Sequence, residues 1–419
     1  MAITRCQRMM LGVLAALQFS CLCAELLHAR PSPSDHVATA RWMAATLDWG
    51  FLSTTSTRSE GTQVGDAFGN PYSFADAGSG VPYFYASDLD ASMIDIFTVG
   101  KGNSRASLAL SEAELKDTNN SVTACKIGTP LGDPENPPCA RLVLSGTLVK
   151  LANNTSEYAK AHQALFARHP SFKFYPPGHA FYIAKMEVDG VWLIDAYGGA
   201  AIIPPADYFA ASLTTTAPPS FRVKSAVSSL PNPADKVGTA RWMAKTLDWG
   251  VLSTTSTRDQ GTHVGNAFGN PYSFADASTG TPYLYASGLD ASMIDLFTAQ
   301  HASPRASLAL SEATLMGPDM LRACKIGTFL GDPENPPCAR LVLSGTVVKL
   351  AKGTAEEKTA RAALLARHPS FANYPASHDF FVAKLEVDGV WLIDQYGGAA
   401  IIPPAEYFKG DPSPMKYLV

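Results

Sequence analysis

An internal repeat constrains the fold more than any other feature of this sequence. Residues 40–58, which begin Ala40-Arg-Trp-Met and end at Arg58 after a hydroxyl-rich run, return almost unchanged as residues 240–258. Each copy opens a unit of roughly 170 residues, an ordinary size for one domain. The sequence therefore predicts two homologous domains, residues 34–209 and 237–408, in place of one large fold.

The segments outside the two units differ from them in composition. Residues 1–24 contain Arg5 and Arg8, an apolar run and then small or polar residues, the layout of a secretory signal peptide. A signal anchor is the alternative, but the apolar run is shorter than the roughly 20 residues of a bilayer span. Residues 210–236 are rich in Ser, Thr, Ala and Pro and are predicted to be a linker, and residues 409–419 a tail.

Composition and charge exclude some classes of protein. With 46% hydrophobic and 17% charged residues, the 419-residue chain can bury two cores and should be globular. A net charge of -4 without a long basic run argues against a nucleic-acid partner, because phosphate contacts need clustered Lys and Arg. No second apolar stretch approaches membrane length, so no membrane span is expected after removal of the signal peptide.

The cysteines outside the predicted leader form two equally spaced pairs. Cys125 and Cys139 are separated by 14 residues, as are Cys324 and Cys338 (139 − 125 = 338 − 324 = 14). In an oxidising compartment this spacing predicts one disulfide per domain, each contributing on the order of 3 kcal/mol. A four-cysteine zinc site is the alternative, but it lacks the short Cys-x-x-Cys spacing.

Three Asn-x-Ser/Thr sequons occur in the first unit, at Asn119, Asn153 and Asn154. None of them recurs in the second unit, so glycans are expected on one half of the molecule. Because Asn153 and Asn154 adjoin, both are not expected to carry a glycan.

Hydrophobic spacing predicts an α+β unit of six or seven mostly antiparallel strands with small helices. A first helix is expected from about Asp35 to Gly50, followed after the first strand by a glycine-rich excursion from Gly61 to Asn70. The further elements expected in the first unit are strands Phe51–Thr57, Tyr72–Ala75, Val81–Ser87, Arg105–Ser111 and Arg141–Leu151 and helices Asp90–Phe97 and Ser156–Arg168.

The sequence near the end of the first unit predicts a β-hairpin. Asp189-Gly190 separates Phe181–Val188 from Val191–Ala196, and Asp-Gly is typical of a type I′ turn between two strands. The second unit predicts a helix cap, because Thr354 and Glu357 have the spacing of a capping box.

Six motifs that occur in both units resemble the CREG (cellular repressor) glycoprotein family. In the first unit they begin at Trp49 (Trp-Gly-Phe-Leu-Ser-Thr-Thr-Ser-Thr), Val81 (Val-Pro-Tyr-Phe-Tyr-Ala-Ser), Arg105 (Arg-Ala-Ser-Leu-Ala-Leu-Ser-Glu), Cys139 (Cys-Ala-Arg-Leu-Val-Leu-Ser-Gly-Thr), Ala167 (Ala-Arg-His-Pro) and Trp192 (Trp-Leu-Ile-Asp-Ala-Tyr-Gly-Gly-Ala). The resemblance covers essentially all of each unit. It implies a split β-barrel like that of pyridoxamine 5'-phosphate oxidase, normally a homodimer of single-domain chains. Two tandem split barrels in one chain are therefore expected to pack as an intramolecular pseudo-dimer.

The resemblance also raises the question of a flavin, since related split barrels bind FMN at the dimer interface. If FMN is bound, a hydroxyl-rich strand followed by an arginine could hold its phosphate; these residues are Ser53, Thr55, Ser56 and Arg58, with Ser253, Thr255, Ser256 and Arg258 in the second unit. The alternative is a strand with a polar face. Flavin oxidases of this fold place Ser-Arg-Lys after the third strand, where this chain has Ser92, Met93 and Ile94 among acids, so no cofactor is favoured.

Other polar residues carry weaker predictions. His169, His179, His368 and His378 occur at matching places and could serve as heme ligands, as in heme-degrading split barrels. The alternative is that His169 complements a helix C-terminus and His179 lies in a turn. Asp195 and Asp394 could act as bases or cap turns. No nucleophile elbow is present in the sequence, and no catalytic residue or metal site is assigned.

Two functions follow from the resemblance. The first is a non-enzymatic glycoprotein of the secretory pathway, extracellular or endolysosomal (in some cells vacuolar), that binds a protein receptor or another partner in those compartments. The second is a flavin- or heme-dependent oxidoreductase with its cofactor in the groove between the domains.

Overall fold

The structure is a computed structural model, and it describes residues 27–28, 30–32, 34–97, 104–115, 123–213, 215–216, 234–298, 302–315 and 322–412. The predicted signal peptide, Asn119 and most of the predicted linker lie outside the described residues. Within the linker, β9 (Thr215–Thr216) pairs antiparallel with β1 (Leu27–His28).

The first domain is a seven-stranded antiparallel sheet with helices around it. The strands lie in the order β3-β2-β5-β6-β7-β4, and β8 pairs with β7. Its strands are β2 (Trp49–Thr55), β3 (Ala67–Ser73), β4 (Tyr83–Ala86), β5 (Arg105–Ser111), β6 (Arg141–Lys150), β7 (Tyr182–Ile194) and β8 (Ala201–Ile202), and its helices are α2 (His36–Thr46), α3 (Ala91–Phe97), α4 (Ser156–Arg168) and α5 (Pro205–Ala210). Short 3-10 turns are η1 (Glu112–Glu114), η2 (Thr123–Cys125), η3 (Pro170–Phe174) and η4 (Pro177–His179).

The second domain repeats this arrangement. Its strands lie in the order β11-β10-β13-β14-β15-β12, with β16 on β15. They are β10 (Trp249–Thr255), β11 (Ala267–Ser273), β12 (Tyr283–Ala286), β13 (Arg305–Ser311), β14 (Arg340–Lys349), β15 (Phe381–Ile393) and β16 (Ala400–Ile401), and the helices are α6 (Lys236–Thr246), α7 (Ala291–Phe297), α8 (Ala355–Arg367) and α9 (Pro404–Tyr407). The 3-10 turns are η5 (Glu312–Thr314), η7 (Arg322–Cys324), η8 (Pro369–Asn373) and η9 (Ala376–His378). The prediction of an α+β fold with two tandem split barrels is confirmed.

Each domain buries its own core between the curved sheet and the first helix. In the first domain, Asp35 caps α2 by accepting a hydrogen bond from Ala38 N at 3.0 Å. Trp42 and Met43 of this helix are fully buried and pack with Tyr72 and Phe84 of the sheet. The helix is thus held by burial of its apolar side chains on the sheet, which stabilises more than intrinsic helix propensity does.

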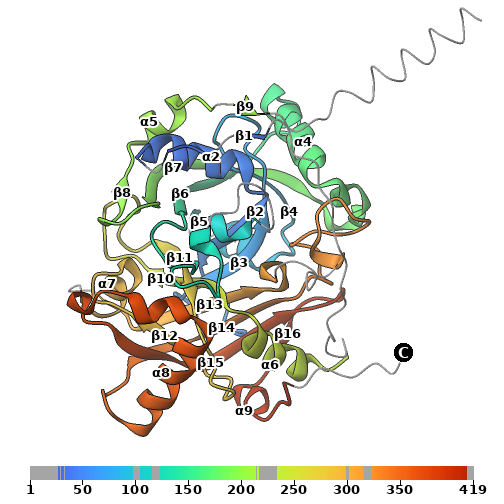
Figure 1. Ribbon diagram of the computed structural model, residues 1–419. Coiled ribbons are helices and arrows are strands. Elements are labelled where there is room, and N and C mark those ends of the chain that lie inside the picture. The colour runs from blue at the N-terminus through green and yellow to red at the C-terminus, as the bar shows by residue number, and fades with distance from the viewer. Residues whose placement is uncertain are drawn as a thin grey trace, which may run out of the picture.

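A third core lies between the domains and makes them a pseudo-dimer (Figure 1). β3 lies against β13, and β11 lies against β5. Phe68 packs edge-on against Trp391 at 5.6 Å, and the reciprocal pair Phe268 and Trp192 is 5.5 Å apart. On the pseudo-twofold axis, Ser53 Oγ and Ser253 Oγ are 2.9 Å apart and fully buried. The tandem chain therefore supplies both halves of this interface.

The predicted hairpin at Asp189-Gly190 is wrong, because β7 continues through these residues from Tyr182 to Ile194. Asp189 is instead the extra residue of a β-bulge, since Gly190 pairs with Ser145 and the next pair joins Val188 to Gly146. A Cβ on Gly190 would meet Gly261 O of the second domain at 2.6 Å. The glycine thus serves a close approach of two backbones and not a turn.

The other differences concern element bounds. β3 begins at Ala67, so the last residues of the expected excursion Gly61–Asn70 are in a strand. α2 ends at Thr46, before the predicted end at Gly50. Thr354 caps α8 through Glu357 N at 3.2 Å, but the Glu357 carboxylate accepts from Gly353 N and not from the cap residue. The expected capping box is therefore half formed.

Candidate functional site

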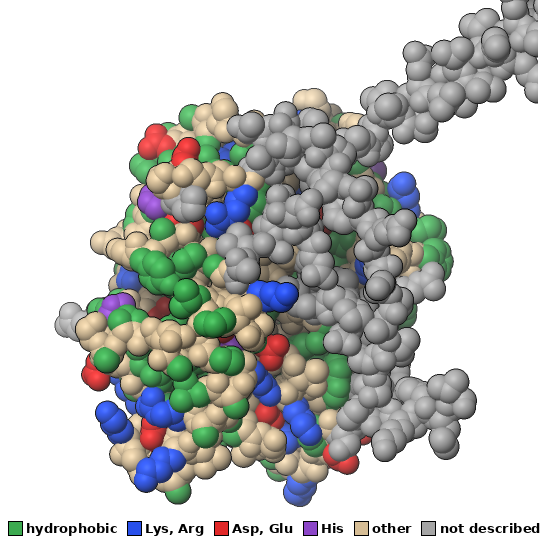
Figure 2. Space-filling view, viewed as in Figure 1, with side chains coloured by type: hydrophobic (Ala, Val, Ile, Leu, Met, Phe, Trp, Pro, Cys, Tyr) green, Lys and Arg blue, Asp and Glu red, His purple; other side chains and the backbone are tan. Residues whose placement is uncertain are grey.

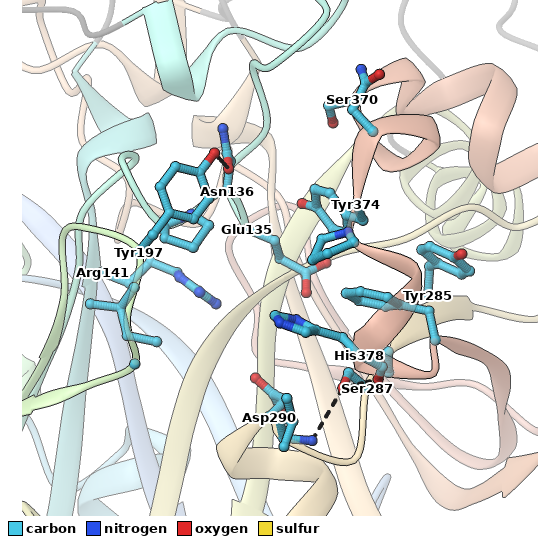
Figure 3. Close-up of a pocket in the computed structure, with 18 of the residues that line it drawn as sticks. Glu135, Asn136, Arg141, Tyr197, Tyr285, Ser287, Asp290, Ser370, Tyr374 and His378 are labelled. Carbon is cyan, nitrogen blue, oxygen red and sulfur yellow. Dashed lines mark hydrogen bonds between the residues drawn. The ribbon is translucent and has the colours of Figure 1, made fainter.

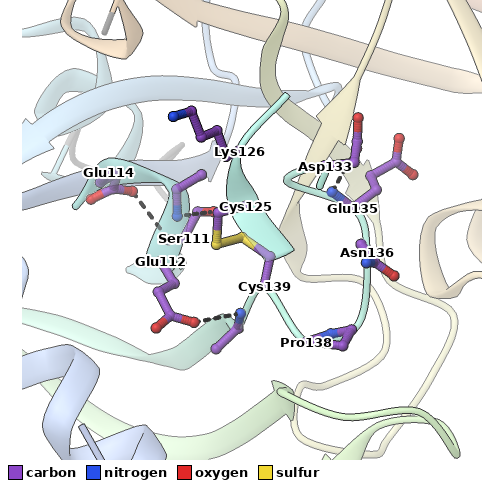
Figure 4. The surroundings of a disulfide bond; sticks show 12 residues. Ser111, Glu112, Glu114, Cys125, Lys126, Asp133, Glu135, Asn136, Pro138 and Cys139 are labelled. Atoms are coloured by element: carbon purple, nitrogen blue, oxygen red, sulfur yellow. Dashed lines mark hydrogen bonds between the residues drawn. A yellow bond between two sulfur atoms is a disulfide. The ribbon is translucent and has the colours of Figure 1, made fainter. Parts of the chain in front are cut away.

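A disulfide-closed loop in each domain reaches into the other domain. Cys125 and Cys139 are joined with an S–S distance of 2.05 Å, and Cys324 and Cys338 with 2.06 Å. All four cysteine side chains are buried in the core between the domains. Figure 4 shows Asp133 and Glu135 extending from the first loop on the side away from the disulfide. Each disulfide thus anchors a loop that carries two acids across the interface.

Asp133 ties this loop to the second domain. Its Oδ2 lies 2.8 Å from His368 Nδ1, and its Oδ1 accepts a hydrogen bond from Ser273 Oγ at 2.6 Å. All three side chains are fully buried. Because a buried carboxylate is expensive unless it is paired, these contacts hold the loop in one position.

Asp332 makes the reciprocal contacts in the first domain. It lies 2.8 Å from His169 Nδ1 and accepts from Ser73 Oγ at 2.5 Å. His169 Nε2 is 3.0 Å from Phe74 O. Burial alone would lower the pKa of His169, but the Asp332 carboxylate outweighs it and raises this pKa. His169 therefore belongs to the domain interface.

A cavity of about 710 Å³ lies beside the first loop, between the two domains (Figure 3). The first domain contributes the loop with Glu135, the start of β6 at Arg141 and the turn at Tyr197. The second domain contributes Tyr285 of β12 and the segment from Ser370 to Phe380. Neither domain could form this cavity alone, and its volume falls in the ordinary range for small-molecule sites.

Aromatic rings form one wall of the cavity. Phe380 stacks on Tyr285 with ring centroids 5.0 Å apart and lies 5.2 Å from Tyr374. The ring of His378, at the end of η9, stacks on Phe380 with ring centroids 6.0 Å apart. This wall presents flat apolar surface together with a few polar edges.

Three polar groups face this wall. The side chain of Arg141 is 4% exposed and extends into the cavity from the first domain (Figure 3). Its Nη1 makes two long hydrogen bonds, to Asn270 Oδ1 at 3.4 Å and to Pro271 O at 3.5 Å, and its Nε has no hydrogen-bond partner among the described residues. The Tyr374 hydroxyl is also buried without such a partner. Burial, with the Asp133 carboxylate nearby, raises the pKa of Glu135 well above its usual range.

The residues predicted to hold an FMN phosphate lie elsewhere and are engaged. Arg58 donates from Nε and Nη2 to both oxygens of Asp95 at 3.1 and 3.0 Å and stacks over Phe68. Asp95 is fully buried and also accepts from Thr57 N at 2.8 Å. Arg258 and Asp295 repeat this pair.

The hydroxyls of the same strands serve internal contacts. Ser56 Oγ donates to Arg58 O at 3.1 Å, and Ser256 Oγ repeats this bond with Arg258 O. Ser53 and Ser253 meet on the pseudo-twofold axis. Thr55 and Thr255 end their strands half-buried. The structure thus does not gather these hydroxyls and arginines at the cavity.

The described part of the segment that follows the predicted third strand, Val81–Ser87, also offers no side chains for a phosphate. Ser92 and Met93 are fully buried at the start of α3, and Met93 belongs to the core of the first domain. Asp90 N-caps the same helix by accepting from Ser92 N at 2.8 Å. The place of the expected cation triplet is therefore filled by core packing.

The remaining predicted residues are distributed over the molecule. His179 and His378 end 3-10 turns, and of the two the structure places His378 at the described cavity. Asp195 lies 2.7 Å from His36 Nδ1, and Asp394 pairs with Lys236. Asn153 and Asn154 are exposed in the turn before α4.

The cavity residues Glu135, Arg141 and Tyr374 were not predicted as a site. A signal was available, because the acid in the disulfide loop and the arginine at the start of a buried strand occur in both units, as Glu334 and Arg340. Their partners lie on the other domain, however, so local sequence gives no hint that they meet.

Comparison with known proteins identifies the family of both domains. A family model described as "CREG, beta-barrel" matches residues 31–210 and again residues 231–409. Protein CREG1 of Gallus gallus is 36% identical over 202 residues, which are 46% of this chain and 96% of that protein. Protein CREG2 of Mus musculus is 35% identical over 202 residues, 46% of this chain and 63% of that protein.

Solved structures are similar at much lower sequence identity. A heme binding protein from Mycobacterium smegmatis has 18% identity and a TM-score of 0.32, with 59% of this chain and 90% of that chain covered. The heme storage protein HutZ from Vibrio cholerae has 11% identity and a TM-score of 0.26, with 37% and 90% covered.

Proposed function

The chain belongs to the CREG β-barrel family, and from this premise we propose that it is a non-enzymatic glycoprotein that acts by binding other molecules. We place it in the secretory pathway, in the extracellular space or in an endolysosomal compartment. Its partner in this proposal is a protein receptor or another molecule of those compartments.

The observation that carries the proposal is the state of Arg58 and Arg258. Each guanidinium is held by both oxygens of a fully buried aspartate, so neither is free to bind the phosphate of a flavin nucleotide. Releasing either arginine would leave a buried carboxylate unpaired, at a cost of about 3 to 5 kcal/mol. These arginines are therefore structural in both domains.

Other features agree with the proposed compartment. Two buried disulfides suit an oxidising environment. The adjoining sequons at Asn153 and Asn154 are exposed in a turn, where an attached glycan meets no steric obstacle from the domain. In the part of the chain that the structure describes, no helix has the length and apolar character needed to cross a bilayer.

The surface shows no continuous basic stripe on the face drawn in Figure 2. Lys and Arg side chains are scattered there among Asp and Glu side chains. A nucleic-acid partner is therefore no part of the proposal, since it would need a basic footprint.

A flavin- or heme-dependent oxidoreductase is the second candidate function. The cavity of about 710 Å³ favours it, because a ring cofactor needs a site of this size and the cavity lies between the domains. The phosphate of FMN would have to rely on Arg141, since the structure gives the cavity no second arginine or lysine among its described lining residues.

The visible spectrum of the full chain, purified from a eukaryotic host, separates the two functions. We expect a colourless protein that stays free of flavin or heme after incubation with FMN or hemin and gel filtration. Flavin or Soret absorbance at one cofactor per chain would contradict the non-enzymatic proposal.

A further inference from the structure

The free polar groups of the inter-domain cavity are hydrogen-bond donors. Arg141 Nε and the hydroxyls of Tyr374, Tyr272 and Ser370 are buried and lack partners among the residues that the structure describes, and each of them can donate. Buried donors without acceptors are costly, at about 1 to 3 kcal/mol each in protein interiors. Glu135 also lines the cavity, but its Oε2 already accepts a hydrogen bond from Ser273 N at 2.9 Å. A ligand that supplies acceptor oxygens would satisfy the donors that lack partners.

The Asp290 carboxylate at the cavity, by contrast, is already engaged as an acceptor. Asp290 caps α7 by accepting from Ser292 N at 2.8 Å and Met293 N at 3.2 Å. Its other oxygen accepts from Asn270 Nδ2 at 3.2 Å. A cationic ligand would therefore have to take Asp290 away from a helix N-terminus, which stabilises a carboxylate.

The charges around the cavity favour a monoanion. Arg141 supplies one positive charge, and the carboxylates of Asp290 and Asp133 lie nearby. A dianionic phosphate would be attracted by one cation and repelled by these acids. A carboxylate carries a single charge and matches a guanidinium in shape.

The wall opposite Arg141 specifies the body of the ligand. Tyr285, Tyr374 and Phe380 present stacked rings, so a flat apolar or aromatic body can pack on them while its carboxylate reaches Arg141. Stacking of this kind adds about 0.5 to 1.5 kcal/mol beyond the burial of area in other proteins.

The rim of this cavity differs from the equivalent place on the other side of the pseudo-twofold axis. Here Asn373 Nδ2 donates to Pro130 O at 2.7 Å. At the equivalent place the side chains are Phe174 and Phe329, whose rings contact each other edge to face at 4.9 Å. Two phenylalanines thus stand at the positions that Asn373 and Pro130 occupy beside Arg141.

We propose that the cavity beside Arg141 is a binding site for a small aromatic carboxylic acid, bound as its anion with its carboxylate on Arg141 and Tyr374 and its ring on the wall of Tyr285 and Phe380. The equivalent place beside Arg340 binds the same ligand more weakly. This site goes beyond the proposed function, because it requires neither catalysis nor a protein partner.

The test uses benzoate, 2-naphthoate and indole-3-carboxylate as probes and the full chain as it is secreted. Isothermal titration should show saturable binding of at least one probe, with one tight site per chain. The matching neutral amide, for instance 2-naphthamide, should bind at least about tenfold more weakly, because it lacks the charge-assisted hydrogen bonds.

Matched variants locate the site. Arg141→Gln should weaken binding by about tenfold or more, whereas Arg340→Gln, in the same local surroundings, should change the affinity of the tight site by less than about twofold. Tyr374→Phe removes a single hydroxyl and should weaken binding by about fivefold, with Tyr175→Phe as its control. Thermal unfolding of each variant shows that it is folded.

Three results would overturn the inference. They are failure of all three acids to bind the folded chain, equal affinity for acid and amide, and equal losses from Arg141→Gln and Arg340→Gln. A flavin found in the purified protein would contradict the proposed function and leave these three criteria to be judged on the flavin-free chain.

Discussion

The two places where a disulfide loop crosses the domain interface share an inner frame and differ at the rim. Asp133 contacts His368 at 2.8 Å and Ser273 at 2.6 Å, and Asp332 contacts His169 and Ser73 at 2.8 and 2.5 Å. At the rim, an asparagine and a proline on one side correspond to two phenylalanines on the other. At these two crossings the halves therefore share the buried contacts of the frame and differ at the exposed rim.

Burial distinguishes the inner frame from the rim. Every member of the inner frame is fully buried, so a change there leaves an unpaired polar group inside the protein. Phe174 and Phe329 are 55% and 66% exposed, so a change there costs little folding stability. A chain that contains both copies can thus present two different rims on one rigid frame.

The inner frame gives the largest expected effect. Asp133→Ala and Asp332→Ala each leave a buried histidine and a serine of the other domain without their acceptor, and each should lower the free energy of unfolding by about 3 to 5 kcal/mol. Chemical denaturation measures both. If the two losses differed by more than about 2 kcal/mol, the frame would not be equivalent in the two halves.

The equivalent glutamates Glu112 in η1 and Glu312 in η5 should break the equivalence in opposite directions. The Glu112 carboxylate accepts hydrogen bonds from Arg30 Nε at 2.5 Å and from Arg30 Nη2 at 3.0 Å. Burial raises the pKa of Glu312 to about 7, and the Asp394 carboxylate adds to this shift. This folded-state pKa lies above the ordinary value of 4.5. Between pH 4.5 and 7, Glu312 is therefore more protonated in the folded state than in the unfolded state. Stability from this group is complete below pH 4.5 and is lost as the pH rises through 7.

Glu312→Gln should therefore raise the free energy of unfolding by up to about 3 kcal/mol above pH 7 and have little effect near pH 4.5. Glu112→Gln should lower it by about 1 to 3 kcal/mol, because Arg30 loses its carboxylate. Denaturation curves across this pH range, with wild type as reference, would contradict the account if Glu312→Gln were destabilising at pH 8.

The rim should control ligand binding. Replacing Pro130 and Asn373 together by phenylalanine copies the other rim and should weaken binding of 2-naphthoate by about tenfold, or about 1.4 kcal/mol. Phe174→Asn with Phe329→Pro is the reciprocal change and should add a second site per chain. Titration calorimetry measures both, and an unchanged stoichiometry with unchanged affinity in both variants would show that the rim has no such role.

The smallest effect concerns the sequons, which occur in the first half. Asn153→Gln and Asn154→Gln should each change the free energy of unfolding by less than about 0.5 kcal/mol, because both side chains are exposed in a turn. Mass spectrometry of the protein expressed in a eukaryotic host should find one glycan on this pair. Two glycans there would contradict the prediction that the adjoining sites exclude each other.

Much of the fold could be predicted from the sequence because its signals are local. The repeat at residues 40–58, the apolar spacing of α2 and the strand patterns of β5 and β6 depend on near neighbours in the chain. The cysteine spacing likewise matches the disulfides that are present.

The errors arise where the other domain decides the structure. Asp189-Gly190 has the sequence of a turn, but Gly190 must pass close to Gly261 and the strand continues. The Ser53 hydroxyl contacts Ser253, and Arg141 points toward a wall built from residues of the other domain, Tyr285, Tyr374 and Phe380. A pattern within one unit carries no information on such partners.

The most direct measurement is a crystal structure of the full chain soaked with 4-bromobenzoate, with anomalous data collected for bromine. The account predicts one strong anomalous peak in the cavity beside Arg141, with the carboxylate on the guanidinium, and a weaker or absent peak beside Arg340. Equal peaks at both places, or none at either at a concentration that saturates the protein in solution, would contradict it.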